Sequence, residues 1–142
     1  KAAGKSVVIS PNDPGFTNPL TMITGIADHC EANGQGRPEG VGETALAIYN
    51  GLVREYVNSV RGREQVTGRK IEQLNMVGGG IQDKFLSELT CRALGIPVLA
   101  GPIEASAAGN FIMQLAGLGE ISDAVEGRDI IRRSFEIRRF DN

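Results

Sequence analysis

The chain has few of the residues that build metal sites and disulfide frameworks. Its 142 residues include two cysteines, Cys30 and Cys91, and one histidine, His29. The cysteines are too far apart to form a zinc-binding pair, and two of them allow one disulfide at most. A reducing compartment is the simpler setting for such a chain. We therefore expect a cytoplasmic protein with no metal site of its own.

A dominant charge and a long apolar run are missing as well. Fifteen basic residues oppose 17 acidic ones, which gives a formal net charge of −2. This balance creates no field that attracts nucleic acid or an anionic membrane, so we expect neither as a partner. No segment approaches the roughly 20 apolar residues of a membrane-spanning helix, and the first residues do not form a signal peptide.

The pattern of apolar and turn-forming residues predicts an α/β fold. At roughly 100–200 residues per domain, the length predicts one domain. Periodicity and capping signals predict strands at 6–10, 71–77 and 96–100, a short tail strand near 135–139, and helices at 19–32, 41–63, 85–94, 104–117 and 122–133. The strand–helix–strand unit 71–100 implies two parallel strands joined by a right-handed crossover.

Apolar stripes on two of these helices are expected to face the core. In helix 85–94 the stripe is Phe85, Leu89 and Ala93, which leaves Cys91 beside it in a structural role. In helix 41–63 the stripe is longer and contains Val41, Ala45, Ile48, Tyr49, Leu52, Val53, Tyr56, Val57 and Val60.

The most informative stretch is LNMVGGGIQDKF, residues 74–85, where three glycines separate a strand from a helix. Glycines leave backbone N–H groups uncovered, and a helix N-terminus at the carboxyl end of a parallel strand favours an anion or a nucleotide. A P-loop pattern is absent. The dinucleotide pattern GxGxxG fails at Asp83, although Glu104 could serve as its ribose-binding acid. A purely structural turn also stays open at this point.

Three segments, taken in order, resemble the FGGY family of carbohydrate kinases. They read ISPNDPGFTNP, TGRKIEQLNMVGGG and GPIEASAAGN, and the similarity extends from Val7 to about Phe140. The resemblance implies the C-terminal part of an actin-like (ribonuclease-H-like) ATPase lobe, with a partial mixed sheet and packed helices. Residues 1–142 would then be the C-terminal lobe of a sugar kinase whose N-terminal lobe is absent from this chain.

The same resemblance implies a function and a set of site residues. The parent enzyme is expected to use ATP and Mg²⁺ to phosphorylate L-rhamnulose at its 1-hydroxyl in rhamnose catabolism. Gly78, Gly79 and Gly80 are expected to contact the adenosine part of ATP, and Ile81 to wall the adenine. Asp83 stands where the family often has asparagine, and it would suit the adenine amino group or the ribose.

Family members carry the phosphate-binding hairpin, the catalytic aspartate and most sugar contacts upstream of the matched region. We therefore expect no catalytic residue in this chain and no kinase activity from it alone. ATP or ADP and a ketose would be bound together with the missing lobe. Surface that this lobe normally covers would be exposed, so self-association of the isolated chain is expected.

Other functions and other residue roles stay open. The alternatives are a sister kinase acting on xylulose, fuculose or glycerol, a nucleotide-binding module without catalysis, and an NAD-binding half-domain. We expect His29 to lie on the surface or to cap a helix, and Glu104 to complement a helix dipole. Gly109 and Asn110 are expected to allow close packing of helix 104–117 on the sheet, with nucleotide contact as the alternative.

Overall fold

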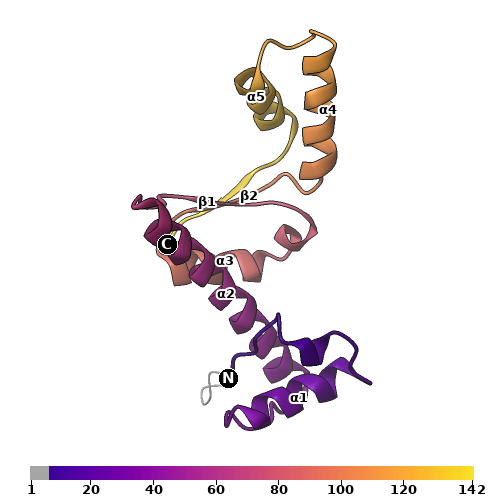
Figure 1. Cartoon of the computed structure of the whole chain (residues 1–142), viewed down its shortest axis with the longest axis vertical. Helices are drawn as coiled ribbons and strands as arrows, with labels where there is room; N and C mark the ends of the chain where they lie inside the picture. The colour runs from indigo at the N-terminus through magenta and orange to yellow at the C-terminus, as the bar shows by residue number, and fades with distance from the viewer. Residues whose placement is uncertain (1–6) are drawn as a thin grey trace. The chain divides into compact units, whose positions relative to one another are not determined.

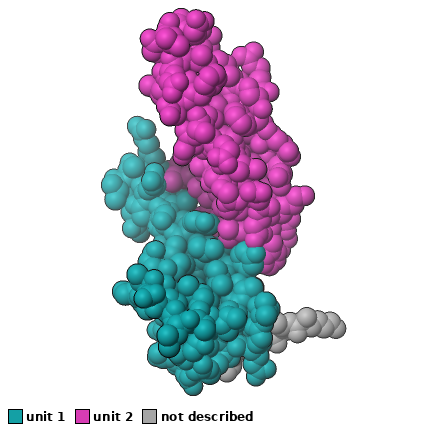
Figure 2. All heavy atoms as spheres, turned by 90° about the vertical axis from the view of Figure 1, so that its right-hand side faces the viewer, with its two compact units in different colours: residues 1–69 teal, residues 70–142 magenta. Residues whose placement is uncertain are grey.

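The computed structural model describes residues 7–142. The chain forms two compact units, residues 1–69 and residues 70–142, which Figure 2 colours separately. That the two units form the single domain expected from the length remains a prediction. No helix in the described part of the chain is long and apolar enough to cross a membrane.

The first unit is built from helices. A short 3₁₀ helix, η1 (Pro14–Phe16), precedes α1 (Met22–Ala32) and the long α2 (Gly40–Thr67) (Figure 1). Helix α1 begins at Met22 and not at Pro19, because the Thr21 hydroxyl accepts the Thr24 N–H at 3.2 Å and caps the helix there. Helix α2 ends at Gly68, whose φ of 65° is the left-handed conformation that glycine adopts readily.

The predicted strand 6–10 is wrong where the structure describes it. Ser6 lies outside the described residues, and residues 7–10 belong to no strand. Val7 and Ile9 are nevertheless buried, and they form a core cluster with Ile26, Cys30 and Ala47. Its buried apolar side chains therefore hold this segment against the core, although it pairs with no strand.

The second unit contains a three-stranded mixed sheet. Its elements are β1 (Leu74–Met76), η2 (Gly79–Gln82), α3 (Lys84–Leu94), β2 (Val98–Ala100), α4 (Ala105–Gly117), α5 (Ala124–Ser134) and β3 (Arg138–Phe140). The strand order is β1-β2-β3. Leu74 pairs with Val98 in parallel register, and Val98 pairs with Phe140 in antiparallel register. The predicted β-α-β unit and the α/β class are confirmed.

Helix α3 buries a face different from the predicted stripe. Phe85 is 46% exposed and Ala93 is exposed, while Leu86, Ser87, Thr90 and Cys91 are buried. The two hydroxyls tolerate burial because Ser87 donates to the Asp83 carbonyl and Thr90 donates to the Leu86 carbonyl. Small polar residues thus form part of the buried face of this helix.

Helices α4 and α5 pack against each other through a glycine. A Cβ placed on Gly127 of α5 would overlap the Ile112 side chain of α4, so the contact requires a residue without a side chain. Helix α5 begins at Ala124 and not at the predicted residue 122, because Asp123 caps it by accepting the N–H groups of Val125 and Glu126. The predicted end of this helix near Arg133 agrees with the structure.

Candidate functional site

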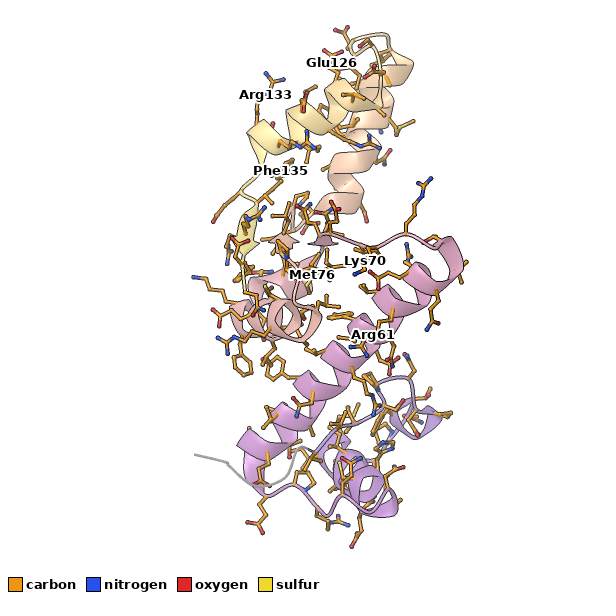
Figure 3. The ribbon with its side chains drawn as sticks, turned by 90° about the vertical axis from the view of Figure 1, so that its left-hand side faces the viewer. Arg61, Lys70, Met76, Glu126, Arg133 and Phe135 are labelled. Atoms are coloured by element: carbon orange, nitrogen blue, oxygen red, sulfur yellow. The ribbon has the colours of Figure 1, made fainter. Side chains whose placement is uncertain are left out.

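The glycine turn connects β1 to α3 and has the predicted strand–turn–helix order. Met76, labelled in Figure 3, ends the strand, and Gly78 follows with φ of 90°, a conformation that few other residues adopt. The Gly78 N–H donates to the Pro102 carbonyl at 3.3 Å. Gly79 and Gly80 then open η2, in which the Ile81 N–H donates to the Gly78 carbonyl.

The second and third glycines leave the turn open. Both are exposed, and a Cβ built on Gly78, Gly79 or Gly80 would meet no atom of the described chain within 4 Å. The Gly79 and Gly80 N–H groups find no acceptor among the described residues. Two adjacent backbone donors with free space above them can receive an oxygen-rich ligand at close range.

The structure corrects two details of this turn. Gly79 and Gly80 lie in the 3₁₀ helix η2, and α3 begins only after it, at Lys84. Asp83 caps α3 by accepting the Leu86 N–H on Oδ1 at 3.2 Å. The Asp83 carboxylate therefore has a structural task beside any ligand contact. Ile81 is buried, with 4% of its surface exposed, so the expectation that it walls an adenine is wrong.

A second turn, after β2, lies beside the first. The Gly101 N–H donates to the Met76 carbonyl at 3.0 Å, and the Pro102 carbonyl accepts the Gly78 N–H. The two turns follow adjacent parallel strands, which is where open α/β sheets form ligand sites. Sequence reasoning missed this role of Pro102. The signal available in the sequence was a Gly-Pro pair directly after the second apolar strand.

Helix α4 leaves this second turn with exposed small residues. Glu104 occupies its N-cap position without a side-chain capping bond. A Cβ on Gly109 would meet nothing within 4 Å, so the expected close packing at this glycine is wrong. Asn110 is exposed, and its Oδ1 accepts a bond from Gln114. The alternative reading of Gly109 and Asn110, contact with a nucleotide, remains a prediction.

The histidine and the cysteines are structural. His29 lies in the last turn of α1 but is not a surface residue, because its side chain is only 13% exposed and its Nδ1 lies 3.4 Å from Asp13 Oδ2. Its Nε2 accepts the Ser10 N–H. Cys91 is buried, and its Sγ lies 3.5 Å from the Ile96 carbonyl oxygen and 3.4 Å from that of Phe140, so its one S–H can donate to either. Burial raises the pKa of the Cys30 thiol, which makes this cysteine less reactive.

No group of three or more His, Cys, Asp or Glu side chains in residues 7–142 is arranged to hold a metal ion. A cavity of about 350 Å³ lies between α3 and β3, lined by Glu88, Arg92, Arg139 and Asp141 among others. Its charges are already paired, since Arg92 faces Glu88 and Arg139 faces Asp141. Of the features described here, the open glycine turn is the strongest candidate for ligand contact.

Comparison with known proteins identifies the family. Residues 1–118 match the model of the C-terminal domain of the FGGY family of carbohydrate kinases. The chain therefore belongs to this family, and its fold is the C-terminal part of an actin-like (ribonuclease-H-like) ATPase lobe.

Individual relatives give a finer likeness. The chain is 40% identical over 132 residues to a rhamnulokinase of Bacillus subtilis, an alignment that covers 93% of this chain and 27% of the relative. It is 41% identical over 129 residues to a rhamnulokinase of Enterococcus faecalis, covering 89% of this chain and 26% of the relative. The chain thus spans about a quarter of the length of the curated relatives it matches.

Proposed function

We propose that this chain is the C-terminal part of an ATP-dependent sugar kinase, and that it supplies part of the adenosine site. The open turn at Gly79 and Gly80 carries this proposal, because it offers free space and two N–H groups without an acceptor among residues 7–142, in a chain of a carbohydrate-kinase family. Gly78 shapes the turn, and Asp83 lies at its far end as the cap of α3.

The described residues fit a nucleoside better than they fit the reacting phosphates. Unpaired amides without side chains allow a ligand to approach the backbone closely. No Lys or Arg lies between Val77 and Asp83, and Asp83 would repel a nearby phosphate. No described cluster of carboxylates could hold Mg²⁺. When bound, MgATP supplies the phosphoryl group and the charge-neutralising ion, and both would be positioned mainly by residues outside this chain.

The acceptor we propose is L-rhamnulose, phosphorylated at its 1-hydroxyl. Support comes from the names of the relatives, since those at 40% and 41% identity are both called rhamnulokinase. A sister kinase for xylulose, fuculose or glycerol is the alternative, because the sugar-contacting residues of the family lie upstream. A purified full-length protein offered these ketoses and glycerol separately would distinguish them. Similar kcat/KM values for all four would contradict the choice of rhamnulose.

The glycine turn is tested by adding a single methyl group in the full-length protein. Gly80→Ala should preserve the fold, because its Cβ meets no protein atom and its φ is not positive. The methyl group would occupy the space needed by the nucleoside, and we expect the KM for ATP to rise by about tenfold, equivalent to ~1.4 kcal/mol of binding free energy. The matched control is Gly117→Ala in α4, which also points into open space.

The results that would contradict this assignment are specific. An unchanged KM for ATP in Gly80→Ala, together with an unchanged melting temperature, would show that the turn connects β1 to α3 without contacting ATP. Stabilisation of the protein by NADH but not by ATP or ADP would favour an NAD-binding half-domain. Stabilisation by ATP without phosphorylation of any sugar by the full-length protein would indicate a nucleotide-binding module without catalysis. We predict that the 142-residue chain alone has no kinase activity.

A further inference from the structure

We propose that an apolar groove in the first unit receives apolar side chains from the part of the parent polypeptide outside these 142 residues. This proposal rests on the proposed function only in requiring a longer parent chain. The groove has a volume of about 300 Å³ and lies where α1 meets the start of α2. We call it the α1–α2 groove; its lining includes Ile23, Pro38, Val41, Thr44, Ala45 and Ile48.

The apolar side chains around the α1–α2 groove are unusually exposed. Val41 is 81% exposed although it falls on the predicted core stripe of α2, and Ile23 on α1 is 66% exposed. Leu20, just before α1, is fully exposed. Two large aliphatic side chains that line one groove and are exposed to solvent are typical of a surface that another element covers.

The polar side chain that lines the groove already has a hydrogen-bond partner, so the groove favours an apolar occupant. The Thr44 hydroxyl donates to the Gly40 carbonyl at 2.9 Å, and the lining contains no charged residue. A sugar or a nucleotide would bring hydroxyl or phosphate groups that find no partner here, at a large desolvation cost. Aliphatic or aromatic side chains satisfy the groove without that cost.

The length of the relatives indicates where those side chains come from. The chain covers 27% of the Bacillus subtilis rhamnulokinase, so nearly three quarters of a protein of that size lies outside the aligned region. A segment of the same polypeptide reaches the groove at an effective concentration of the order of millimolar. A second copy would need about 800 Å² of buried surface on each partner, far more than a groove lined by a few side chains provides.

Cysteine labelling of the full-length protein tests this covering directly. Val41→Cys and Val66→Cys place the same thiol on α2 at positions that are 81% and 88% exposed within this chain. The native Cys30 and Cys91 are buried and contribute little background. We expect a maleimide to label position 41 at least about tenfold more slowly than position 66 in the native protein. Peptide mass spectrometry reads each position separately, and unfolding in urea should make the two rates equal.

Several results would overturn the proposal. One is equal labelling of the two positions in the native protein. Another is protection of position 41 that appears only as protein concentration rises, which would assign the groove to a second copy. A photocrosslinker attached at position 41 should join it to residues outside this chain, and crosslinks only to residues 70–142 would contradict that. If Val41→Cys fails to fold, Ile23→Cys repeats the measurement from α1.

Kinase activity measured on the same preparations separates this proposal from the function proposed above. Protection at position 41 without sugar phosphorylation would remove the kinase assignment and leave the groove assignment intact. Full kinase activity with position 41 freely labelled would remove the groove assignment and leave the kinase assignment intact.

Discussion

The two units satisfy the backbone hydrogen-bonding groups of their non-helical segments in different ways. In the second unit, β1, β2 and β3 pair by backbone hydrogen bonds in a regular ladder. In the first unit, side chains replace the missing strands around residues 7–10. Gln35 bonds both backbone groups of Val8, accepting its N–H at 2.7 Å and donating to its carbonyl at 2.9 Å. Its amide group thus imitates the peptide group of a neighbouring strand.

Helix α2 completes the pairing from the other side. Asn50 donates to the Val7 carbonyl and Arg54 donates to the Ile9 carbonyl, while the Ile9 N–H bonds the Ala47 carbonyl. Every one of these bonds depends on a particular side chain or on the close approach of the helix. A backbone ladder tolerates most substitutions on its strands, whereas an arrangement of this kind depends on single residues.

The largest loss of stability is expected from Gly101→Ala in the second unit. Its φ of 147° is one that L residues rarely adopt, and a Cβ would lie 2.6 Å from the Glu136 carbonyl oxygen. Strain and overlap together should lower the free energy of unfolding by about 2–4 kcal/mol. Chemical denaturation measures the loss, and hydrogen exchange should locate it in β2 and β3. An equal increase in exchange over residues 7–69 would contradict a local effect of this substitution.

A smaller loss is expected from Gly51→Ala in the first unit. The added Cβ would lie 2.6 Å from the Ile9 carbonyl oxygen, so α2 could no longer approach the extended segment. We expect destabilisation by about 1–3 kcal/mol, with faster hydrogen exchange at Val8 and Ile9. Gly62→Ala is the matched control on the same helix, where a Cβ meets nothing. It should stabilise the unit by about 0.5–1 kcal/mol, because alanine favours a helix over glycine.

The sequence predicted those parts of the fold that depend on local patterns. Apolar periodicity predicted the five α-helices of residues 7–142, and the strand–helix–strand order of residues 71–100 predicted the parallel β1–β2 pair. The side chains that hold residues 7–10 were invisible to such patterns, because Gln35, Asn50 and Arg54 lie 27, 43 and 45 positions from their partners. The burial of Val7 and Ile9 is what the apolar letters indicate, but the strand inferred from them was wrong.

The candidate site shows the same division between local and tertiary information. The openness of the glycine turn follows from residues without side chains, and the sequence contains that information directly. The burial of Ile81 and the contact between Gly78 and Pro102 depend on how the sheet and helices pack, so neighbouring letters could not reveal them. The capping role of Asp83 was not predicted, although an aspartate three residues before Leu86 is a common capping arrangement.

A substitution of Gln35 tests the same comparison with a smaller expected loss of stability than that of Gly101→Ala. Gln35→Met keeps the length of the side chain but deletes both bonds to Val8, and we expect a loss of about 1–3 kcal/mol at 0.5–1.5 kcal/mol per bond. Gln114→Met is the control, because Gln114 is exposed and bonds only an exposed side chain, that of Asn110. Denaturation curves that coincide for the two variants would show that side-chain pairing contributes nothing to the first unit.

The smallest effect concerns pH and the start of α5. The Ser122 N–H and then the Ser122 hydroxyl, both bonded to Glu126, hold the pKa of this carboxyl below its ordinary value (Glu126 is labelled in Figure 3). A lowered folded-state pKa means that the stabilisation is present above the unfolded value of about 4.3 and is lost as pH falls through the folded value. Amide exchange in the first turn of α5 should therefore gain protection relative to Glu126→Gln as pH rises from 3 to about 5. Identical pH profiles for the two proteins would show that this carboxylate, unlike the side chains of the first unit, has no part in holding its backbone.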